Sequence, residues 1–140
     1  MRILAFDYGT KRVGIAVTDP LQIIATALIT LHPEKLFPFL EDYLKKEEVE
    51  RFVVGIPQQM DGTPSQSAQH ITGFIRKLAK QFPHIPIEKM DERFTSKMAE
   101  ASLISGNANA KQRKDKGLVD SIAATIILQS YLERKSLQGL

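Results

Sequence analysis

The chain has 140 residues, a formal net charge of +3, and 43% hydrophobic and 25% charged residues. This size and composition predict a single folded domain over residues 1–140 and exclude a disordered chain. The sequence lacks an apolar run of the roughly 18 residues that cross a bilayer, and its start lacks the plan of a signal peptide, so we expect a cytoplasmic protein without a membrane partner. The absence of cysteine excludes disulfides, thiolate metal sites and cysteine nucleophiles.

The first part of the sequence predicts a strand hairpin, a third strand and a helix. Arg2 to Phe6 and Val13 to Val17 are short apolar runs on either side of a turn, and Ile23 to Leu31 is rich in residues typical of strands. Pro33 suits a helix start, and apolar residues recur at helical spacing after it. These residues are Leu36, Phe37, Leu40, Tyr43 and Leu44.

The middle of the chain alternates between strands and helices. Arg51 to Ile56 predicts a fourth strand, and Ser65 can cap the helix that follows. Ile85 to Met90 predicts a fifth strand, which leads to a helix capped by Thr95 and ended by Gly106. The helix after Ser65 has an apolar stripe made of Ala68, Ile71, Ile75, Leu78 and Phe82.

The last part of the sequence predicts a loop and a final helix. Asn107 to Lys116 is polar and basic, whereas Leu118 to Leu132 is apolar almost all round and predicts a well-buried helix. The hairpin strands must pair antiparallel, and the fourth and fifth strands follow helical crossovers that favour parallel pairing. We therefore expect an α/β fold in which a five-stranded mixed sheet carries helices on both faces.

Carboxylates at the ends of two predicted strands are candidates for chemistry. Asp7 ends an apolar strand, where a charged group loses hydration unless a metal or phosphate site compensates. Its alternative role is that of a turn residue that accepts hydrogen bonds from the Gly9-Thr10 backbone. Asp91 and Glu92 follow the fifth strand, at the edge where a parallel sheet presents ligands. Their alternative roles are a turn cap for Asp91 and an ion pair with Arg93 for Glu92.

A third acidic position lies on the final helix. Asp120 stands among apolar residues, and its alternative role is that of a helix-start residue favoured by the helix dipole. Three acidic sites suit magnesium, because hard cations prefer oxygen ligands, and two such ions could support phosphodiester cleavage. We expect no ligand among the histidines, since His32 lies beside a proline, His70 on a helix and His84 between prolines.

The positive charge of the chain is concentrated in one segment. Lys111 to Lys116 carries four positive charges and one negative charge, which equals the net charge of the chain. Such a segment either contacts phosphates or is simply solvated, and charge alone leaves both roles open. Its candidate phosphate-binding residues are Lys111, Arg113, Lys114 and Lys116.

Several motifs resemble the YqgF family, which is also called RuvX. The segment Ala5 to Ala16, with Asp-Tyr-Gly-Thr-Lys-Arg at its centre, resembles the opening motif of that family, and further blocks follow in the family order and spacing. The resemblance covers essentially the entire chain. The sequence departs from the family at Gln58-Gln59, where a Leu-Asn pair is common, and from related resolvases in having no glutamate at the end of the fourth strand. The further blocks are Val54–Pro57, Met60–Gly62, Asp91–Ser96 and Lys116–Ala124.

The resemblance implies a ribonuclease H-like fold related to Holliday-junction resolvases, and a nuclease that depends on Mg²⁺ or Mn²⁺. It also implies a role in maturing the 5′ end of small-subunit ribosomal RNA, so that the nucleic-acid partner is pre-16S rRNA, with branched DNA as the alternative. The protein would be a monomer or a homodimer. The resemblance places Asp7, Glu92 and Asp120 in the catalytic, metal-binding positions with Asp91 as a helper ligand. It places Gly9 and Thr10 in the turn that faces the phosphate, and we expect these two residues to bind nucleic acid together with Lys11, Arg12 and Arg93.

Two other functions remain open at the level of sequence. The motif Asp7 to Thr10 also resembles a phosphate loop of actin-like and sugar-kinase ATPases. The length argues against this class, because such ATPases close a cleft between two lobes and a second Asp-x-Gly phosphate loop is not visible in the sequence. The other alternative is a non-catalytic nucleic-acid-binding regulator that keeps the fold.

Overall fold

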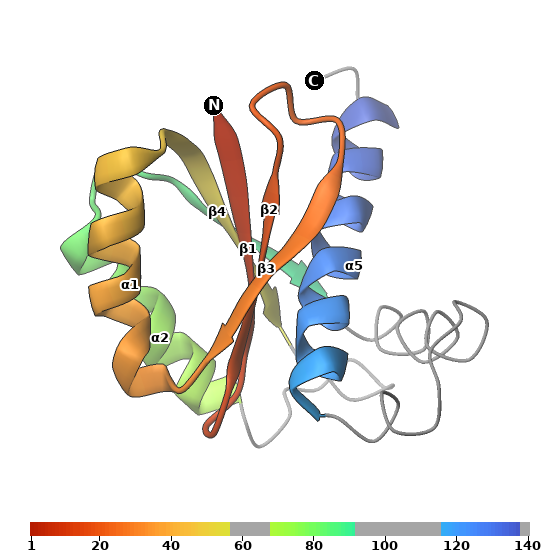
Figure 1. Ribbon diagram of the computed structural model, residues 1–140. Helices are drawn as coiled ribbons and strands as arrows, with labels where there is room; N and C mark the ends of the chain where they lie inside the picture. Colours follow the sequence, from red (N-terminus) through yellow and green to blue (C-terminus); the bar gives the residue numbers. More distant parts are fainter. Residues whose placement is uncertain (57–67, 92–115, 138–140) are drawn as a thin grey trace.

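The computed structural model describes residues 1–56, 68–91 and 116–137. These residues form a mixed sheet that is covered by helices on both faces, as Figure 1 shows. The α/β architecture expected from the sequence is therefore confirmed. The strands are β1 (Arg2–Tyr8), β2 (Val13–Thr18), β3 (Ala25–Leu31), β4 (Val49–Ile56) and β5 (Ile87–Asp91), and the helices are α1 (Pro33–Lys46), α2 (Ala68–Gln81) and α5 (Lys116–Leu137).

The sheet has five strands in the order β3-β2-β1-β4-β5. The strands β1, β2 and β3 pair antiparallel, whereas β4 pairs parallel with both β1 and β5. The hairpin and the two crossovers predicted from the sequence are confirmed. Strand β1 lies in the middle of the sheet, and the carboxyl ends of β1, β4 and β5 meet at one edge, called the carboxyl edge below.

The alternation of side chains along β1 divides the core into two layers. Leu4 and Phe6 are fully buried in the layer beneath α1 and α2, whereas Ile3 and Ala5 are fully buried in the layer beneath α5. This is the division that a strand with helices on both sides requires, because successive side chains point to opposite faces. The four residues before Asp7 thus anchor it from both sides of the sheet.

Helix α1 begins where the sequence predicts. Pro33 occupies the first turn, and the Nδ1 atom of His32 accepts a hydrogen bond from the Glu34 N–H at 3.2 Å. Because a helix start leaves backbone N–H groups without partners, this contact gives His32 a capping role. Pro38 lies inside the helix, close enough to its start to be tolerated.

Strand β3 begins two residues later than the sequence predicts. Ile23 and Ile24 were expected in the strand, but both are exposed in the loop before it. The carboxylate of Asp19 accepts hydrogen bonds from the N–H groups of Ile23 at 2.7 Å, Ile24 at 2.8 Å and Leu21 at 3.2 Å. These bonds, above all the one from Ile24, hold the pKa of Asp19 below its ordinary value. The Asp19 carboxylate therefore accepts hydrogen bonds from backbone N–H groups that would otherwise be available for strand pairing if β3 began earlier.

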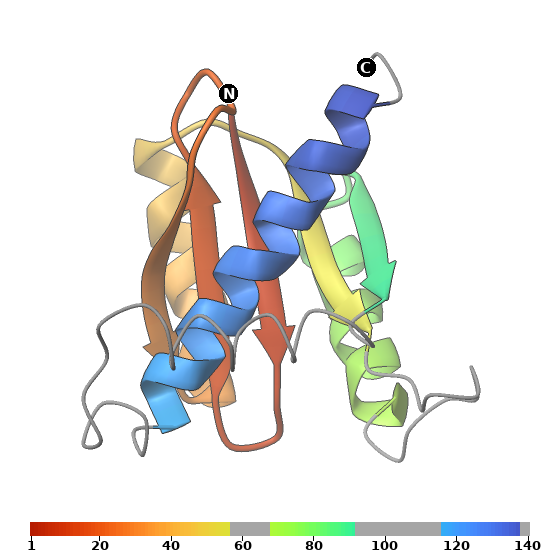
Figure 2. The same cartoon turned by 90° about the vertical axis from the view of Figure 1, so that its right-hand side faces the viewer.

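Helix α5 is longer than predicted at both ends. It begins at Lys116, so the prediction that places this residue in a loop is wrong, and it extends to Leu137. Its middle is buried as expected, but Gln129 and Glu133 are exposed, so the helix is not apolar all round. Figure 2 shows α5 crossing the sheet diagonally. Within the described ranges, no helix is both long and apolar enough to cross a membrane. The residues of α5 that are buried are Ala124, Ile126, Ile127, Leu128 and Tyr131.

Three sequence predictions lie outside the described residues. They are the cap at Ser65, the helix between Thr95 and Gly106, and the basic segment from residue 107 to residue 115.

Candidate active site

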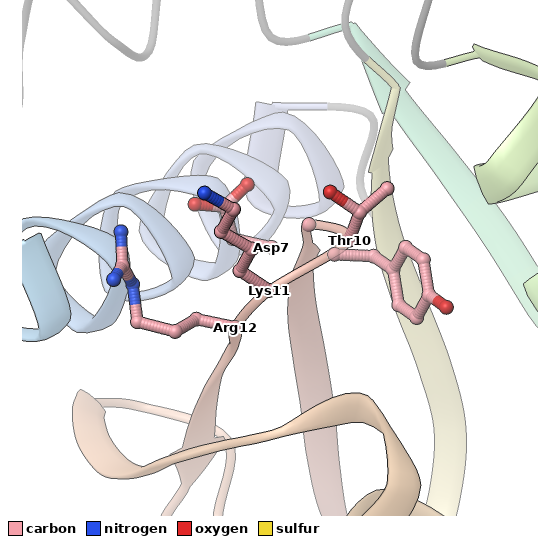
Figure 3. Close-up of a pocket in the computed structure, with 6 residues that line it drawn as sticks. Asp7, Thr10, Lys11 and Arg12 are labelled. Atoms are coloured by element: carbon pink, nitrogen blue, oxygen red, sulfur yellow. The ribbon is translucent and has the colours of Figure 1, made fainter.

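Asp7 lies near the carboxyl end of the central strand. It follows Ile3 and Ala5 at the strand spacing of two, so it belongs to the side of the sheet that α5 covers. Its side chain is half-buried. Figure 3 shows the carboxylate directed to the side of the sheet on which α5 lies. Side chains at every second position of β1 pack into the core beneath α5. Asp7 places a charged group at such a position, where an apolar residue would be expected.

Glycines occupy the positions beside Asp7 on both neighbouring strands. Gly14 of β2 is its cross-strand partner, and Gly55 of β4 lies one step beyond the pair of Phe6 and Val54. Because glycine has no side chain, neither position fills the space next to the carboxylate. Asp7 is therefore flanked by backbone alone on the two strands that pair with β1.

The turn after Asp7 is closed by a backbone hydrogen bond. The N–H of Gly9 donates to the carbonyl oxygen of Arg12 at 2.8 Å. The N–H of Gly9 therefore has its acceptor within the hairpin. The close approach also requires glycine, since a Cβ atom at position 9 would lie 2.8 Å from the Arg12 carbonyl oxygen.

Replacing Gly9 by alanine tests this close approach. We expect Gly9→Ala to lower the free energy of unfolding by about 1–3 kcal/mol, because the added methyl group meets a backbone atom that cannot turn aside. Urea unfolding measures the loss. The matched control is Gly73→Ala on α2, where a Cβ meets nothing within 4 Å and alanine favours the helix by about 0.5–1 kcal/mol. Equal stability of the two variants would show that the turn adapts to a side chain.

Asp7 and the turn residues line one pocket. The cavity has a volume of about 250 Å³ and is lined by the six residues from Asp7 to Arg12. In Figure 3, the side chains of Asp7, Lys11 and Arg12 extend to the same side of the turn. Lys11 is exposed and Arg12 is half-buried. The structure therefore places the carboxylate of Asp7 and the cations of Lys11 and Arg12 around one pocket. Gly9 and Thr10, which were predicted to belong to the same site, line it as well.

The other predicted site residues are described only in part. Asp91 is the last residue of β5 and pairs with Ile56 of β4. Asp120 lies in the early turns of α5. Figures 1 and 2 both show that α5 begins at the same end of the molecule as the β1–β2 turn. The side chains of Asp91, Lys116 and Asp120 are not among those that the structure describes. Among the described residues, no three histidine or acidic side chains form a group that could hold a metal. Outside the described residues lie Glu92, Arg93, Lys111, Arg113 and Lys114.

Sequence reasoning missed an aromatic pair at this site. Tyr8 lines the pocket, and its ring stacks on Phe74 of α2 with 4.4 Å between ring centroids and 13° between ring planes. Phe74 is buried but was omitted from the predicted apolar stripe of α2. Its spacing of three residues from Ile71 and four from Leu78 is helical and could have identified it.

Comparisons with known proteins identify a family and close relatives. The family model described as RuvX, Holliday junction resolvase, matches residues 1–134. A protein of Christiangramia forsetii named "Putative pre-16S rRNA nuclease" is 58% identical over 131 residues, which cover 94% of this chain and 97% of that protein. A protein of the same name from Phocaeicola vulgatus is 52% identical over 134 residues, which cover 96% of each chain.

Solved structures share the fold at low sequence identity. The fowlpox virus resolvase in complex with Holliday junction DNA matches with a TM-score of 0.59 and 14% identity, over 96% of this chain and 98% of that chain. The RuvC protein of T. thermophilus in complex with a Holliday junction substrate matches with a TM-score of 0.53 and 16% identity, over 96% of both chains. The chain therefore has the ribonuclease H-like fold of these resolvases.

Proposed function

Because this chain belongs to the RuvX family, we propose that it is a metal-dependent nuclease that hydrolyses a phosphodiester bond in pre-16S rRNA. The observation that carries the proposal is the position of Asp7, a half-buried carboxylate at the carboxyl end of the central strand. The pocket that Asp7 lines also contains Lys11 and Arg12, and the residues beside Asp7 on both neighbouring strands are glycines.

The donor chemistry of this edge fits Mg²⁺ or Mn²⁺. Magnesium is usually held by one or two carboxylates together with substrate phosphates, so an open pocket that contains one described carboxylate suits it. We propose Asp7, Glu92 and Asp120 as the ligands, with Asp91 as a helper. When bound, the metal would supply positive charge at the scissile phosphate and lower the pKa of the attacking water. Of Asp91 and Glu92, we favour Glu92 as the direct ligand, because the resemblance to the family places it in an acidic catalytic position.

The cations of the turn have a separate task in this proposal. Lys11 and Arg12 would neutralise phosphates on either side of the scissile bond and hold the backbone against the carboxyl edge. Contacts of this type position the substrate and supply affinity, but they do not read the base sequence. We assign the same task to Arg93 and to the basic residues Lys111, Arg113, Lys114 and Lys116.

The name of the relatives favours RNA as the substrate of this chain. Two relatives above 50% identity bear the name pre-16S rRNA nuclease, whereas the resolvases in complex with DNA junctions are below 20% identity and support the fold alone. The description of the family model keeps a four-way DNA junction as the second candidate substrate.

The decisive experiment compares the two substrates. The purified chain is incubated with a 5′-extended fragment of 16S rRNA precursor or with a four-way DNA junction, with manganese or magnesium and with a chelator in excess. We expect metal-dependent cleavage of the precursor, which the chelator abolishes. Cleavage of the junction alone would replace the proposed substrate by branched DNA, and cleavage of neither substrate would overturn the nuclease proposal.

A further inference from the structure

Tyr8 connects the pocket to the other side of the sheet. It is the last residue of β1 and alternates with Asp7, so it belongs with Leu4 and Phe6 on the side of α1 and α2. Its side chain is nevertheless only half-buried and lines the pocket that Asp7 and the turn form. The pocket therefore has a carboxylate from one side of the sheet and an aromatic ring from the other.

The ring of Tyr8 is held from behind by a buried aromatic cluster. Phe74 stacks against it, and Phe74 in turn makes edge-to-face contacts with Phe6 at 5.5 Å and with Phe37 at 6.1 Å between ring centroids. Phe6 is fully buried, and Phe74 and Phe37 are buried as well. Phe74 covers one face of the Tyr8 ring. The part of the ring that lines the pocket is therefore its edge or its other face.

We propose that Tyr8 is a stacking platform for an unpaired base next to the phosphate held at Asp7. The inference rests on the proposed nuclease function and makes its substrate more specific, because it requires at least one single-stranded nucleotide beside the scissile bond. Aromatic rings that are fixed on one face and accessible on the other bind bases by stacking, with little regard to their identity. A base inside a duplex is already stacked on its neighbours, so a duplexed flank cannot use the platform.

Two substitutions separate base stacking from simple packing. Tyr8→Phe keeps the ring, whereas Tyr8→Leu keeps an apolar side chain against Phe74 but removes the aromatic face. The matched control is Tyr43→Leu, which removes the tyrosine that stacks on Phe39 of α1 at 5.7 Å. Tyr43 lies in the last turns of α1, outside the lining of the pocket.

The experiment measures binding of a short single-stranded RNA that contains 2-aminopurine, in the presence of a chelator so that cleavage does not occur. We expect wild type and Tyr8→Phe to quench the fluorescence and to bind within twofold of each other. Tyr8→Leu should bind roughly tenfold more weakly and lose the quenching. The same base placed in a duplex should show no difference between the variants, and Tyr43→Leu should match wild type. Thermal melts ensure that only folded variants are compared.

The outcome is separable from that of the nuclease proposal. If folded Tyr8→Leu binds and quenches like wild type, the stacking platform is wrong, even when the wild-type chain cleaves precursor RNA. If Tyr8→Leu and Tyr43→Leu lose affinity equally, the effect is one of general packing and the inference is also wrong. If stacking is observed but the wild-type chain cleaves neither substrate, the platform stands and the nuclease proposal fails.

Discussion

The variant Asp7→Asn is expected to lose metal-dependent cleavage by on the order of a thousandfold while it retains the fold. The amide has the shape of the carboxylate but no negative charge, so it holds a divalent cation much more weakly against a phosphate. The fold should persist because the side chain is only half-buried and lies at the end of its strand. Initial rates on precursor RNA at saturating manganese measure the loss, and thermal melting measures the fold.

The control for this variant is Asp42→Asn. Asp42 is exposed on α1 and pairs with Lys46 at 3.5 Å, a surface contact that contributes little to stability. Its variant should cleave at the wild-type rate. Millimolar manganese should raise the melting temperature of wild type and Asp42→Asn, because a ligand that binds only the folded state stabilises it, but not that of Asp7→Asn. If Asp7→Asn cleaves at the wild-type rate with metal, Asp7 has no role in catalysis.

The largest loss of stability is expected for Phe6→Ala. Phe6 is fully buried beside Asp7, and its ring lies edge-on to Phe52 and to Phe74, with 5.5 Å between centroids in both pairs. Truncation leaves a cavity between β1, β4 and α2, and we expect it to lower the free energy of unfolding by about 3–5 kcal/mol. The melting temperature should fall by roughly 10–15 °C. Urea unfolding and thermal melting measure both quantities.

The comparison for Phe6→Ala is Phe39→Ala. Phe39 is only half-buried, and it stacks on Tyr43 at the outer part of the same layer. Its truncation removes less buried area, so the loss of stability should be clearly smaller. Equal losses in the two variants would contradict the central place given to Phe6 in the aromatic cluster.

The fold could be predicted from the sequence because local patterns and chain connectivity pointed the same way. The hairpin after Asp7 and the helical crossovers to β4 and β5 are compatible with few other strand orders in the sheet. The start of β3 could not be predicted in this way. Ile23 and Ile24 are strand-forming residues, and their exposure depends on hydrogen bonds to Asp19, a contact that no periodicity reveals.

The candidate site was predictable where its residues are close in the chain. The segment Asp7 to Arg12 is continuous, so a motif was enough to group its members. The stacking of Tyr8 on Phe74 joins residues that are far apart in the sequence, and so does the placement of Gly14 and Gly55 on either side of Asp7. Both features follow from strand register and helix docking, which are properties of the assembled sheet.

The central place of β1 has a consequence for local motion. Both edges of this strand are hydrogen-bonded, to β2 and to β4, and the residues from Ile3 to Phe6 are fully buried. Amide protons in such a strand exchange with solvent only when the whole sheet opens, whereas those of an edge strand such as β3 can exchange through local fraying. We therefore expect slow amide exchange from Ile3 to Phe6, so that the strand leading to Asp7 is held in place by the fold before a ligand binds.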